Sequence, residues 1–468
     1  MAAARLLAPG MDFDGFRVDA RLHEGGMAVL YAVSKPGIEL PLVMKVPRLA
    51  FGTHPACLVG FEVEQMILGA LTGVHVPRLV ASGTSADPPY LVMERIDGPS
   101  LAEIARRSPL PAAEVARLVR TVADALHDLH RQNVIHLDVK PANVIFRASG
   151  EAVLVDFGLA RHGDLPDLVE EEFHSPVGTG AYISPEQLAG NRSDPRSDLF
   201  ALGVAAYQFA TGAKPFGEPT TRSGMRRRLY VDPLPPRALN PEVPPWLQEV
   251  ILRCLEVRAE ERYATAAQIA HDVAHPEQVH LTERANRTRR QGPVTVVKRW
   301  LTGLRPRPTA PLSPAAQLAR APQVLVAVDP EHRDEALAEA MRDALRRALA
   351  AEPGLRVTLM TVCEPQFVLE DAATEIQQGR HVQALMEMRH WARPLALAPD
   401  IVRFHVAEGT DPAAALLDYA DRHHADRIIM GARAASPMRR YLGSVSSRVV
   451  AEAPCSVSVI RPRRRAGR

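Results

Sequence analysis

The sequence predicts a multidomain protein whose C-terminal part is an α/β domain with a mainly parallel sheet. Three observations predict this fold class: a length of 468 residues, a basic and Pro-rich stretch between two folded parts, and an alternation of strand and helix patterns after that stretch. A chain of 468 residues exceeds what one hydrophobic core usually supports. A composition with 46% hydrophobic and 24% charged residues argues against large-scale disorder.

Cysteine use, hydropathy and charge exclude several classes of protein. Cys57, Cys254, Cys363 and Cys455 lie far apart without a CxxC pair, which argues against a zinc site or a disulfide framework and favours buried thiols in a reducing compartment. No run of 18 apolar residues and no secretory signal are present, so we expect a cytoplasmic protein without a transmembrane segment. The net charge of +2 gives no sign of a nucleic-acid partner, and we expect none.

The first predicted elements are a hairpin, a strand and a helix. Residues 22–31 predict a hairpin whose tip, at Gly25 and Gly26, lets backbone N–H groups approach a ligand closely, although an ordinary hairpin turn explains the pattern equally well. The next strand carries Lys45 between apolar neighbours, and an ammonium on a buried strand needs a partner. Glu64, on the helix that follows, is the partner that we expect.

Four polar side chains follow a buried helix at close spacing. Residues 112–131 predict a helix with an apolar stripe along one side, and the loop after it contains Asp138, Lys140 and Asn143 in order. Asp156 follows 13 residues after the last of these, in the sequence Asp-Phe-Gly. A carboxylate, an ammonium, a carboxamide and a second carboxylate at this spacing indicate phosphoryl transfer.

Residues farther along predict how that loop is held. Thr179 is expected to hydrogen-bond the first two of these side chains, Asp138 and Lys140. Glu186 has no evident local partner, and Arg262 is its expected buried ion-pair mate. Asp198 opens an apolar helix that ends at Gly212, and its carboxylate is expected to accept hydrogen bonds from the backbone of the loop.

Together these motifs resemble the eukaryotic-like bacterial Ser/Thr protein kinase family over about 265 residues. The resemblance implies an α+β bilobal protein kinase fold, ATP and Mg²⁺ in the cleft between a β-rich and a helical lobe, and transfer of the γ-phosphoryl group to Ser or Thr hydroxyls of protein substrates. It implies that Asp138 accepts the hydroxyl proton, Lys140 neutralises phosphate charge, and Asn143 and Asp156 hold the metal ion. The implied catalytic residues are Lys45, Glu64, Asp138, Lys140, Asn143, Asp156 and Thr179.

The resemblance also implies a nucleotide site between the two lobes. The backbone C=O of Glu94 and N–H of Ile96 would bind the adenine edge, while apolar side chains would lie above and below it. The glycine tip of the hairpin and Lys45 would approach the phosphates. The implied ATP-binding residues are Leu22, Gly25, Gly26, Ala28, Leu30, Val43, Lys45, Met93, Glu94, Ile96 and Ile145.

Two departures from the family pattern leave an alternative open. Leu137 stands where the family usually has Arg before the catalytic Asp, so a receiver for an activation-loop phosphate is missing and we expect no need for phosphorylation, for instance at Ser175. His23 and Ala28 stand where a full glycine-rich loop would have Gly. The alternative is a pseudokinase scaffold that binds ATP without transferring phosphate.

The chain is predicted to divide into a kinase domain over residues 12–275, a basic Pro-rich linker over 276–321 and a second domain over 322–462. Residues 276–321 contain nine Lys/Arg but only two Glu residues, and five prolines follow position 292 within this stretch. This composition predicts an extended linker, with one short apolar island around Trp300. Solvation of the basic side chains is the ordinary interpretation, and contact with an acidic surface or a membrane is the alternative.

The second domain resembles the universal stress protein family over about 140 residues. Strands are predicted over 323–328, 355–362, 401–406, 427–430 and 456–460, and helices over 334–351, 374–393, 412–424 and 438–452. Asp329 after the first strand, Gly431 after the fourth, and Gly443 with Ser444 at the last helix match the family's nucleotide-binding positions. Ala434 replaces a glycine of that pattern, so nucleotide binding and a structural, dimer-forming module both stay open. The last strand is expected at the sheet edge, and the family resemblance implies a homodimer through it.

Overall fold

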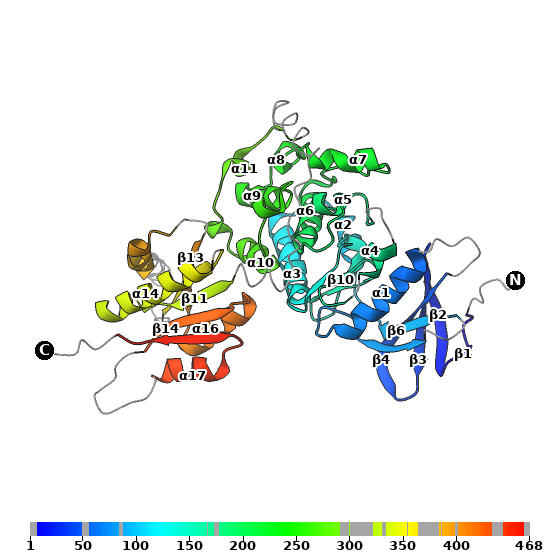
Figure 1. Cartoon of the computed structure of the whole chain (residues 1–468), viewed down its shortest axis with the longest axis horizontal. Helices are drawn as coiled ribbons and strands as arrows, with labels where there is room; N and C mark the ends of the chain where they lie inside the picture. Colours follow the sequence, from blue (N-terminus) through cyan, green and yellow to red (C-terminus); the bar gives the residue numbers. More distant parts are fainter. Residues whose placement is uncertain are drawn as a thin grey trace, which may run out of the picture. The chain divides into compact units, whose positions relative to one another are not determined.

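The computed structural model divides the chain into two compact units, Met1–Gln317 and Leu318–Arg468. The elements of each unit are labelled in Figure 1. The residues that the structure describes are 7–48, 56–83, 88–165, 167–172, 177–290, 299, 322–329, 334–352, 354–363, 383–384, 386–397, 401–432 and 443–462. No helix among them is long and apolar enough to span a membrane.

The first unit begins with a six-stranded antiparallel sheet in the order β1-β2-β3-β4-β6-β5. The predicted hairpin is present, because β2 and β3 pair antiparallel on either side of Gly25 and Gly26. A helix, α1 (Ala56–Ala70), follows β4 and packs beside the sheet (Figure 1). The strands are β1 (Asp12–Phe13), β2 (Phe16–Glu24), β3 (Ala28–Lys35), β4 (Ile38–Pro47), β5 (Leu79–Gly83) and β6 (Tyr90–Glu94).

The strand register places four of the predicted ligand-facing side chains on one face of this sheet. Leu30 on β3 lies opposite Lys45 on β4, and Val43 on β4 lies opposite Met93 on β6. Because side chains two residues apart on a strand share a face, Val43 and Lys45 point the same way, and directly opposed residues of antiparallel strands share that face too. Leu30, Val43 and Met93 therefore lie on the same face of the sheet as Lys45.

Helices and short strands form the rest of the first unit. The predicted apolar stripe of α3 is buried, with Leu118, Val122 and Leu126 at most 1% exposed. α6 is buried along nearly its whole length and ends at Gly212, whose φ of 76° is left-handed as predicted for a helix C-terminus. The helices are α2 (Leu101–Ala105), α3 (Ala112–Arg131), α4 (Leu168–Glu172), α5 (Pro185–Leu188), α6 (Arg196–Thr211), α7 (Arg222–Arg226), α8 (Pro236–Leu239), α9 (Pro245–Cys254), α10 (Ala266–Ala274) and α11 (Glu283–Asn286). The short strands are β7 (Val134–Ile135), β8 (Val144–Phe146), β9 (Ala152–Leu154) and β10 (Arg161–His162), and the 3₁₀ turns are η1 (Pro141–Asn143), η2 (Arg227–Leu229), η3 (Ala259–Glu261) and η4 (Pro276–Gln278).

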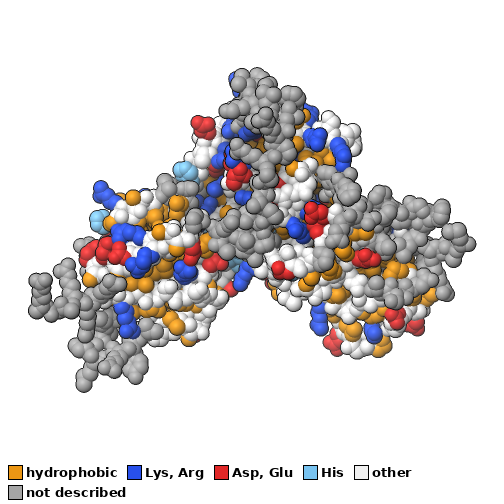
Figure 2. All heavy atoms as spheres, in the orientation of Figure 1, with side chains coloured by type: hydrophobic (Ala, Val, Ile, Leu, Met, Phe, Trp, Pro, Cys, Tyr) orange, Lys and Arg blue, Asp and Glu red, His pale blue; other side chains and the backbone are white. Residues whose placement is uncertain are grey.

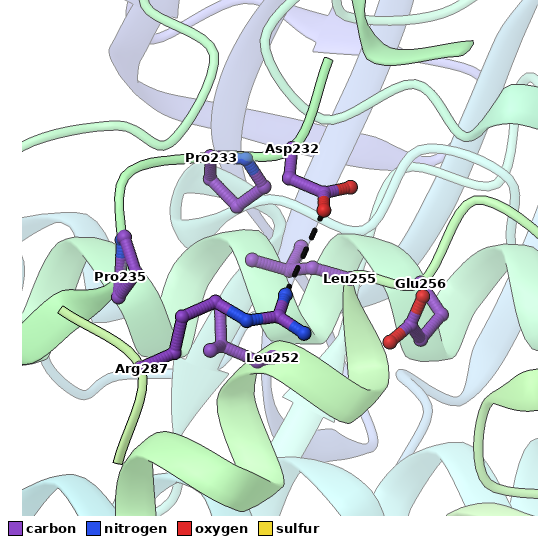
Figure 3. A pocket seen from close by; sticks show the side chains of 7 residues that line it. All are labelled: Asp232, Pro233, Pro235, Leu252, Leu255, Glu256 and Arg287. Carbon is purple, nitrogen blue, oxygen red and sulfur yellow. Dashed lines mark ion pairs between the residues drawn. The ribbon is translucent and has the colours of Figure 1, made fainter. Parts of the chain in front are cut away.

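The beginning of the predicted linker is folded onto the helical part, where we expected extended chain. Gln248 on α9 donates hydrogen bonds of 2.7 and 2.9 Å to the carbonyls of Arg284 and Arg287, and the guanidinium of Arg284 pairs with Glu249 at 3.0 Å. Lys/Arg and Asp/Glu side chains are interspersed over the described surface (Figure 2). Figure 3 shows the ion pair of Arg287 with Asp232, 3.7 Å long, beside Leu252 and Leu255 at the end of α9. Residues 291–298 and 300–321, with Trp300, lie outside the described part.

The second unit is built on a parallel sheet of five described strands in the order β13-β12-β11-β14-β15. Alternate residues of β11 face opposite sides, so that Val324 and Val326 pack with α14 while Leu325 packs with α16 and α17. Helices therefore cover both faces, as Figure 1 shows. The elements are β11 (Gln323–Ala327), α14 (Glu335–Ala351), β12 (Arg356–Cys363), η5 (Arg393–Leu395), β13 (Val402–Glu408), α16 (Pro412–Arg422), β14 (Arg427–Gly431), α17 (Ser444–Glu452) and β15 (Ser456–Ile460).

The α/β prediction for this unit is confirmed, including the position of its last strand. β15 is hydrogen-bonded to β14 alone within the described sheet and so forms one edge. Half of the helix predicted over residues 374–393 and the start of the one over 438–452 lie outside the described residues, as do Ala434 and the basic tail after position 462.

Candidate active site

The structure brings Asp138, Lys140, Asn143 and Thr179 together around one carboxylate. The Oγ1 of Thr179 donates a hydrogen bond of 2.7 Å to Asp138 Oδ1, and the Nζ of Lys140 donates to Asp138 Oδ2 at 2.5 Å. Lys140 also donates to Thr179 Oγ1 at 3.1 Å, and Asn143 Nδ2 donates to Asp138 Oδ2 at 3.1 Å. Both carboxylate oxygens of Asp138 thus accept hydrogen bonds, one from Thr179 and the other from Lys140 and Asn143.

The backbone before Asp138 is held by a buried carboxylate beneath it. Asp198, at 0% exposure, accepts hydrogen bonds from His136 N at 2.9 Å and Leu137 N at 2.8 Å, as predicted. Leu137 has a φ of 62°, a left-handed conformation that is unfavourable for a residue with a Cβ. Gln187 Nε2 donates to Leu137 O at 2.9 Å, so both backbone polar groups of this residue are bonded to side chains. These bonds fix the direction in which Asp138 points.

Lys45 lies between two carboxylates from different parts of the chain. Its Nζ is 2.5 Å from Glu64 Oε2 on α1 and 2.9 Å from Asp156 Oδ1. Burial disfavours the charged ammonium, but the two carboxylates outweigh it and raise the pKa of Lys45. The positive charge of Lys45 in turn lowers the pKa of Asp156, while burial raises the pKa of Glu64. At neutral pH the cluster therefore keeps a charged Lys45 and an ionised Asp156.

The turn that carries Asp156 is fixed by a buried phenylalanine and a glycine contact. Asp156 has a φ of 66°, and Phe157 is 0% exposed with its ring 5.0 Å from the ring of His136. A Cβ on Gly158 would lie 3.1 Å from the backbone oxygen of Gly60 on α1, closer than side-chain carbons usually approach. α1 and the Asp-Phe-Gly turn therefore pack backbone to backbone, which keeps Glu64 and Asp156 near Lys45.

Asn143 and Asp156 offer oxygen atoms of the kind that Mg²⁺ prefers. Asn143 Nδ2 donates to Asp138 O at 3.0 Å as well as to the Asp138 carboxylate, so the amide is oriented by its nitrogen. No described residue donates a hydrogen bond to the Oδ1 of Asn143, and the carboxylate of Asp156 is 47% exposed. Val155 N donates to Asn143 O at 3.0 Å, which ties the two segments together. A carboxamide and a carboxylate oxygen fit a magnesium ion bridged by phosphates.

The predicted nucleotide wall is assembled by the sheet and the segment after β6. Leu22 is 47% exposed, and Leu30, Val43, Ile96 and Ile145 are half-buried. The side chain of Glu94 forms a two-bond ion pair with Arg147, of which the Nη2–Oε2 bond is 2.9 Å long, and this pairing lowers the pKa of Glu94. No described residue accepts a hydrogen bond from Ile96 N–H.

The hairpin tip has space on its outer side. Gly25 N donates to Ala28 O at 3.0 Å, and a Cβ on Gly26 would meet no atom within 4 Å. The imidazole of His23 lies beside Gly25, with its Nε2 3.5 Å from where a Cβ would be. Neither Gly25 nor Gly26 has a left-handed φ. The hairpin tip therefore leaves space beside Gly26, while the contacts of Gly25 are those of an ordinary turn.

The ion pair predicted between Glu186 and Arg262 is confirmed. Arg262 donates to the two carboxylate oxygens at 2.7 and 2.8 Å, and its side chain is 0% exposed. It also donates to the carbonyl of Arg196 at 2.9 Å and lies over the ring of Phe200. This pair joins the end of the segment that contains Thr179 to the buried helix α6.

Two arginine contacts of the same segment were missed in the sequence. Asp167 Oδ2 lies 2.9 Å from Arg192 Nε and 3.5 Å from Arg161 Nε, and the carboxylate is only 8% exposed. Arg228, 1% exposed, donates to the carbonyls of Gly180 at 2.5 Å and Ala181 at 3.3 Å without a carboxylate partner among the described residues. Burial lowers the pKa of Arg228 to about 10, so it remains charged at neutral pH. Nothing in the local sequence spacing distinguishes these arginines from arginines on the surface. Ser175, in the same segment as Asp167, lies outside the described residues.

The second unit presents its predicted nucleotide-site residues at the point where the strand order reverses. β11 lies between β12 and β14, and Asp329 and Gly431 stand at the carboxyl ends of the neighbouring strands β11 and β14. Gly431 also has a packing role, because a Cβ there would lie 2.8 Å from Leu337 Cδ2. Gly443 caps α17 and Ser444 is its first residue.

Two family models match this chain, and several known proteins are similar to it. Residues 22–274 match the family model described as Protein kinase domain, and residues 322–461 match the one described as Universal stress protein family. Serine/threonine-protein kinase Pkn1 of Myxococcus xanthus is 33% identical over 286 residues, 59% of this chain and 41% of that protein. Serine/threonine-protein kinase PknB of Mycobacterium leprae is 31% identical over 266 residues, 56% of this chain and 42% of that protein. The crystal structure of the Mycobacterium tuberculosis PknI kinase domain has a TM-score of 0.46 and 25% identity, covering 58% of this chain and 99% of that one.

A lysine on a β-strand paired with a glutamate on the next helix, together with a loop that carries Asp, Lys and Asn, is the arrangement of a phosphoryl-transfer site. The kinase model matches more than half of the chain, so this chain belongs to the protein kinase family. It carries a universal stress protein domain at its C-terminal end. The chain spans about two fifths of the length of Pkn1 and of PknB.

Proposed function

We propose that this chain transfers the γ-phosphoryl group of ATP to Ser or Thr hydroxyls of protein substrates, with Mg²⁺ as cofactor. One observation carries the proposal: two separate polar clusters, Asp138 with Thr179 and Lys140, and Lys45 with Glu64 and Asp156, are both complete. A kinase needs the first cluster for the acceptor and the second for the nucleotide. Pkn1 and PknB are serine/threonine-protein kinases, which agrees with this activity.

The residues of the acceptor cluster have distinct tasks. An incoming hydroxyl would replace one of the donors on Asp138, because four hydrogen bonds already occupy its carboxylate oxygens. Asp138 then orients the hydroxyl and takes its proton as the oxygen bonds to the γ-phosphorus and the bond to ADP breaks. The ammonium of Lys140, 24% exposed, faces the charge that develops on the phosphoryl oxygens.

The residues of the nucleotide cluster position and neutralise the phosphates. Lys45, oriented by Glu64, would bind the α- and β-phosphates, and Asn143 with Asp156 would hold Mg²⁺, which supplies charge neutralisation when bound. Leu22, Leu30, Val43, Met93 and Ile145 would flank the adenine, whose edge would meet the backbone of Glu94 and Ile96.

A test of this function compares the native protein with Asp156→Ala, using radiolabelled ATP and a Ser/Thr-rich protein acceptor. Loss of one metal ligand should lower phosphate incorporation by at least ~10²-fold. Asp19→Ala, which removes an exposed carboxylate that accepts a hydrogen bond from Ser34, is the matched control and should retain activity. Equal incorporation by the native protein and Asp156→Ala would exclude the kinase activity. The comparisons lend no support to the pseudokinase alternative.

For the C-terminal domain we infer nucleotide binding at Asp329, Gly431, Gly443 and Ser444 and dimerisation through the edge strand β15. Support for the first comes from the position of Asp329 and Gly431 at the reversal of strand order, where α/β sheets bind ligands. Support for the second comes from the unpaired outer edge of β15 in the described sheet. We also propose a cytoplasmic location, because the four cysteines show the spacing of thiols in a reducing compartment. Fluorescent ATP analogues titrated onto Gly443→Val and native protein test the nucleotide site.

A further inference from the structure

The element formed by α7 and η2 carries a cluster of exposed arginines. Arg222, Arg226 and Arg227 are exposed, and none of them pairs with a carboxylate among the residues that the structure describes. Lys and Arg side chains are visible in Figure 2 at the place where Figure 1 labels α7. Unpaired guanidinium groups gathered on one short element are a surface that favours carboxylates, because the planar fork binds both oxygens of one group.

This basic element is fixed against the segment that follows Thr179. Arg228, next to the exposed arginines, donates to the carbonyl of Gly180 at 2.5 Å and also bonds the carbonyl of Ile183. A Cβ on Gly180 would lie 2.8 Å from Met225 Cε, so α7 packs directly on that segment. Thr179 in turn bonds Asp138. The exposed arginines therefore lie on an element that packs against Gly180, the neighbour of the residue that bonds Asp138.

The acidic side chains near this element are already paired. Glu218 forms an ion pair of 2.7 Å with Lys214, whose ammonium also lies 5.6 Å from the ring of Tyr182. Asp232, which follows η2, is 3.7 Å from Arg287 and also pairs with Arg299. Within the described part of the chain, the cationic side chains of α7 and η2 therefore have no local compensation, and the positive field extends over the neighbouring segment.

We propose that Arg222, Arg226 and Arg227 select protein substrates that carry Asp or Glu residues beside the acceptor Ser or Thr. This inference rests on the proposed kinase function and names the substrate class for the same site. A peptide whose hydroxyl reaches Asp138 passes Thr179 and Gly180, and its flanking side chains meet α7. Exposed ion pairs are individually weak and screened by salt, so the preference is the sum of several contacts and acts on KM rather than kcat.

Two fluorescein-labelled peptides test this proposal with the full chain. Both contain one Ser, flanked in one peptide by four Glu and in the other by four Gln. Fluorescence anisotropy at low salt should show the Glu peptide binding roughly tenfold more tightly, and the difference should fall at high salt. Arg226→Glu/Arg227→Glu should abolish the preference. Arg117→Glu/Arg131→Glu, which makes the same change in net charge on exposed side chains of α3, should keep it.

Steady-state kinetics and a second polyanion complete the test. In the native protein the Glu peptide should have a KM roughly tenfold lower than the Gln peptide with a similar kcat, and Arg226→Glu/Arg227→Glu should raise that KM. Equal binding of the two peptides, equal effects of the two double variants, or equally tight binding of a single-stranded oligonucleotide would each overturn the proposal. Phosphate transfer to neither peptide would instead remove the proposed function, and anisotropy, which needs no catalysis, distinguishes the two failures.

Discussion

Asp198 gives the sharpest test of how the catalytic loop is held. Its carboxylate, 0% exposed, accepts bonds from His136 N at 2.9 Å through Oδ2 and from Leu137 N at 2.8 Å through Oδ1. His130 Nε2 lies 2.9 Å from Oδ2 as well. In Asp198→Asn one oxygen becomes an NH₂ group. Whichever way the amide is oriented, that NH₂ faces one backbone N–H, so a donor meets a donor.

The expected cost follows from these contacts. The backbone N–H that faces the new NH₂ group, on His136 or on Leu137, loses its charge-assisted acceptor, and the other N–H keeps a neutral acceptor. The left-handed backbone of Leu137 also loses the carboxylate that holds it in place. Together these effects amount to about 3 kcal/mol, or roughly a hundredfold in the equilibrium for opening the loop.

Hydrogen exchange followed by mass spectrometry measures this directly. In Asp198→Asn, amides of residues 134–139 should exchange roughly a hundredfold faster than in the native chain, while amides of β12 in the second unit should not change. Asp19→Asn, on an exposed carboxylate, should leave residues 134–139 unaffected. An acceleration below about threefold in Asp198→Asn would mean that the loop does not depend on this carboxylate and would refute the argument.

Three further predictions concern other parts of the chain. Asp167→Asn breaks the buried ion pair with Arg192 and should lower phosphate transfer roughly tenfold, whereas Ser175→Ala should change phosphate transfer by no more than about threefold. A larger loss in Ser175→Ala than in Asp167→Asn, measured with radiolabelled ATP, would contradict this prediction. Because burial raises the pKa of Cys254 to about 12, iodoacetamide at pH 8 should label half-buried Cys363 but label Cys254 only after denaturation, as mass spectrometry would show. The full chain at tens of micromolar should scatter light as a dimer and Val457→Pro, on β15, as a monomer; a monomeric native chain would remove the dimer proposal.

Elements with strong local patterns could be predicted from the sequence. The apolar stripe of α3, the Gly212 end of α6 and the five parallel strands depend on periodicity and capping, which neighbouring residues determine. The partners of Lys45 and Asp198 could be predicted too, because a charged group at a buried position restricts what can lie beside it.

Contacts that depend on tertiary packing could not be predicted. The run of three arginines ending at Arg228 has the pattern of a solvated surface, yet Arg228 is buried because backbone carbonyls and the ring of Phe216 surround its guanidinium. The basic stretch after position 276 has the composition of a linker, yet α11 packs on α9 because Gln248 offers donors to its carbonyls. The polar partners of Arg228 and of α11, a backbone carbonyl and the amide of Gln248, lie many residues away in the sequence.

The segment from the Asp-Phe-Gly turn to Glu186 is attached to the rest of the unit at its described points by several side-chain contacts. Near its start, Asp167 supplies a carboxylate to Arg192 at 2.9 Å; near its end, Thr179 bonds Asp138, and Arg262 holds Glu186. A carboxylate on Arg192 satisfies the kind of cation that a phosphate would otherwise recruit. The apolar Leu137 before Asp138 is then understandable, because a second cation there would be buried without an anion. The described contacts of this segment are therefore made by side chains of the chain itself, and Arg228 holds the basic element α7 against the same segment.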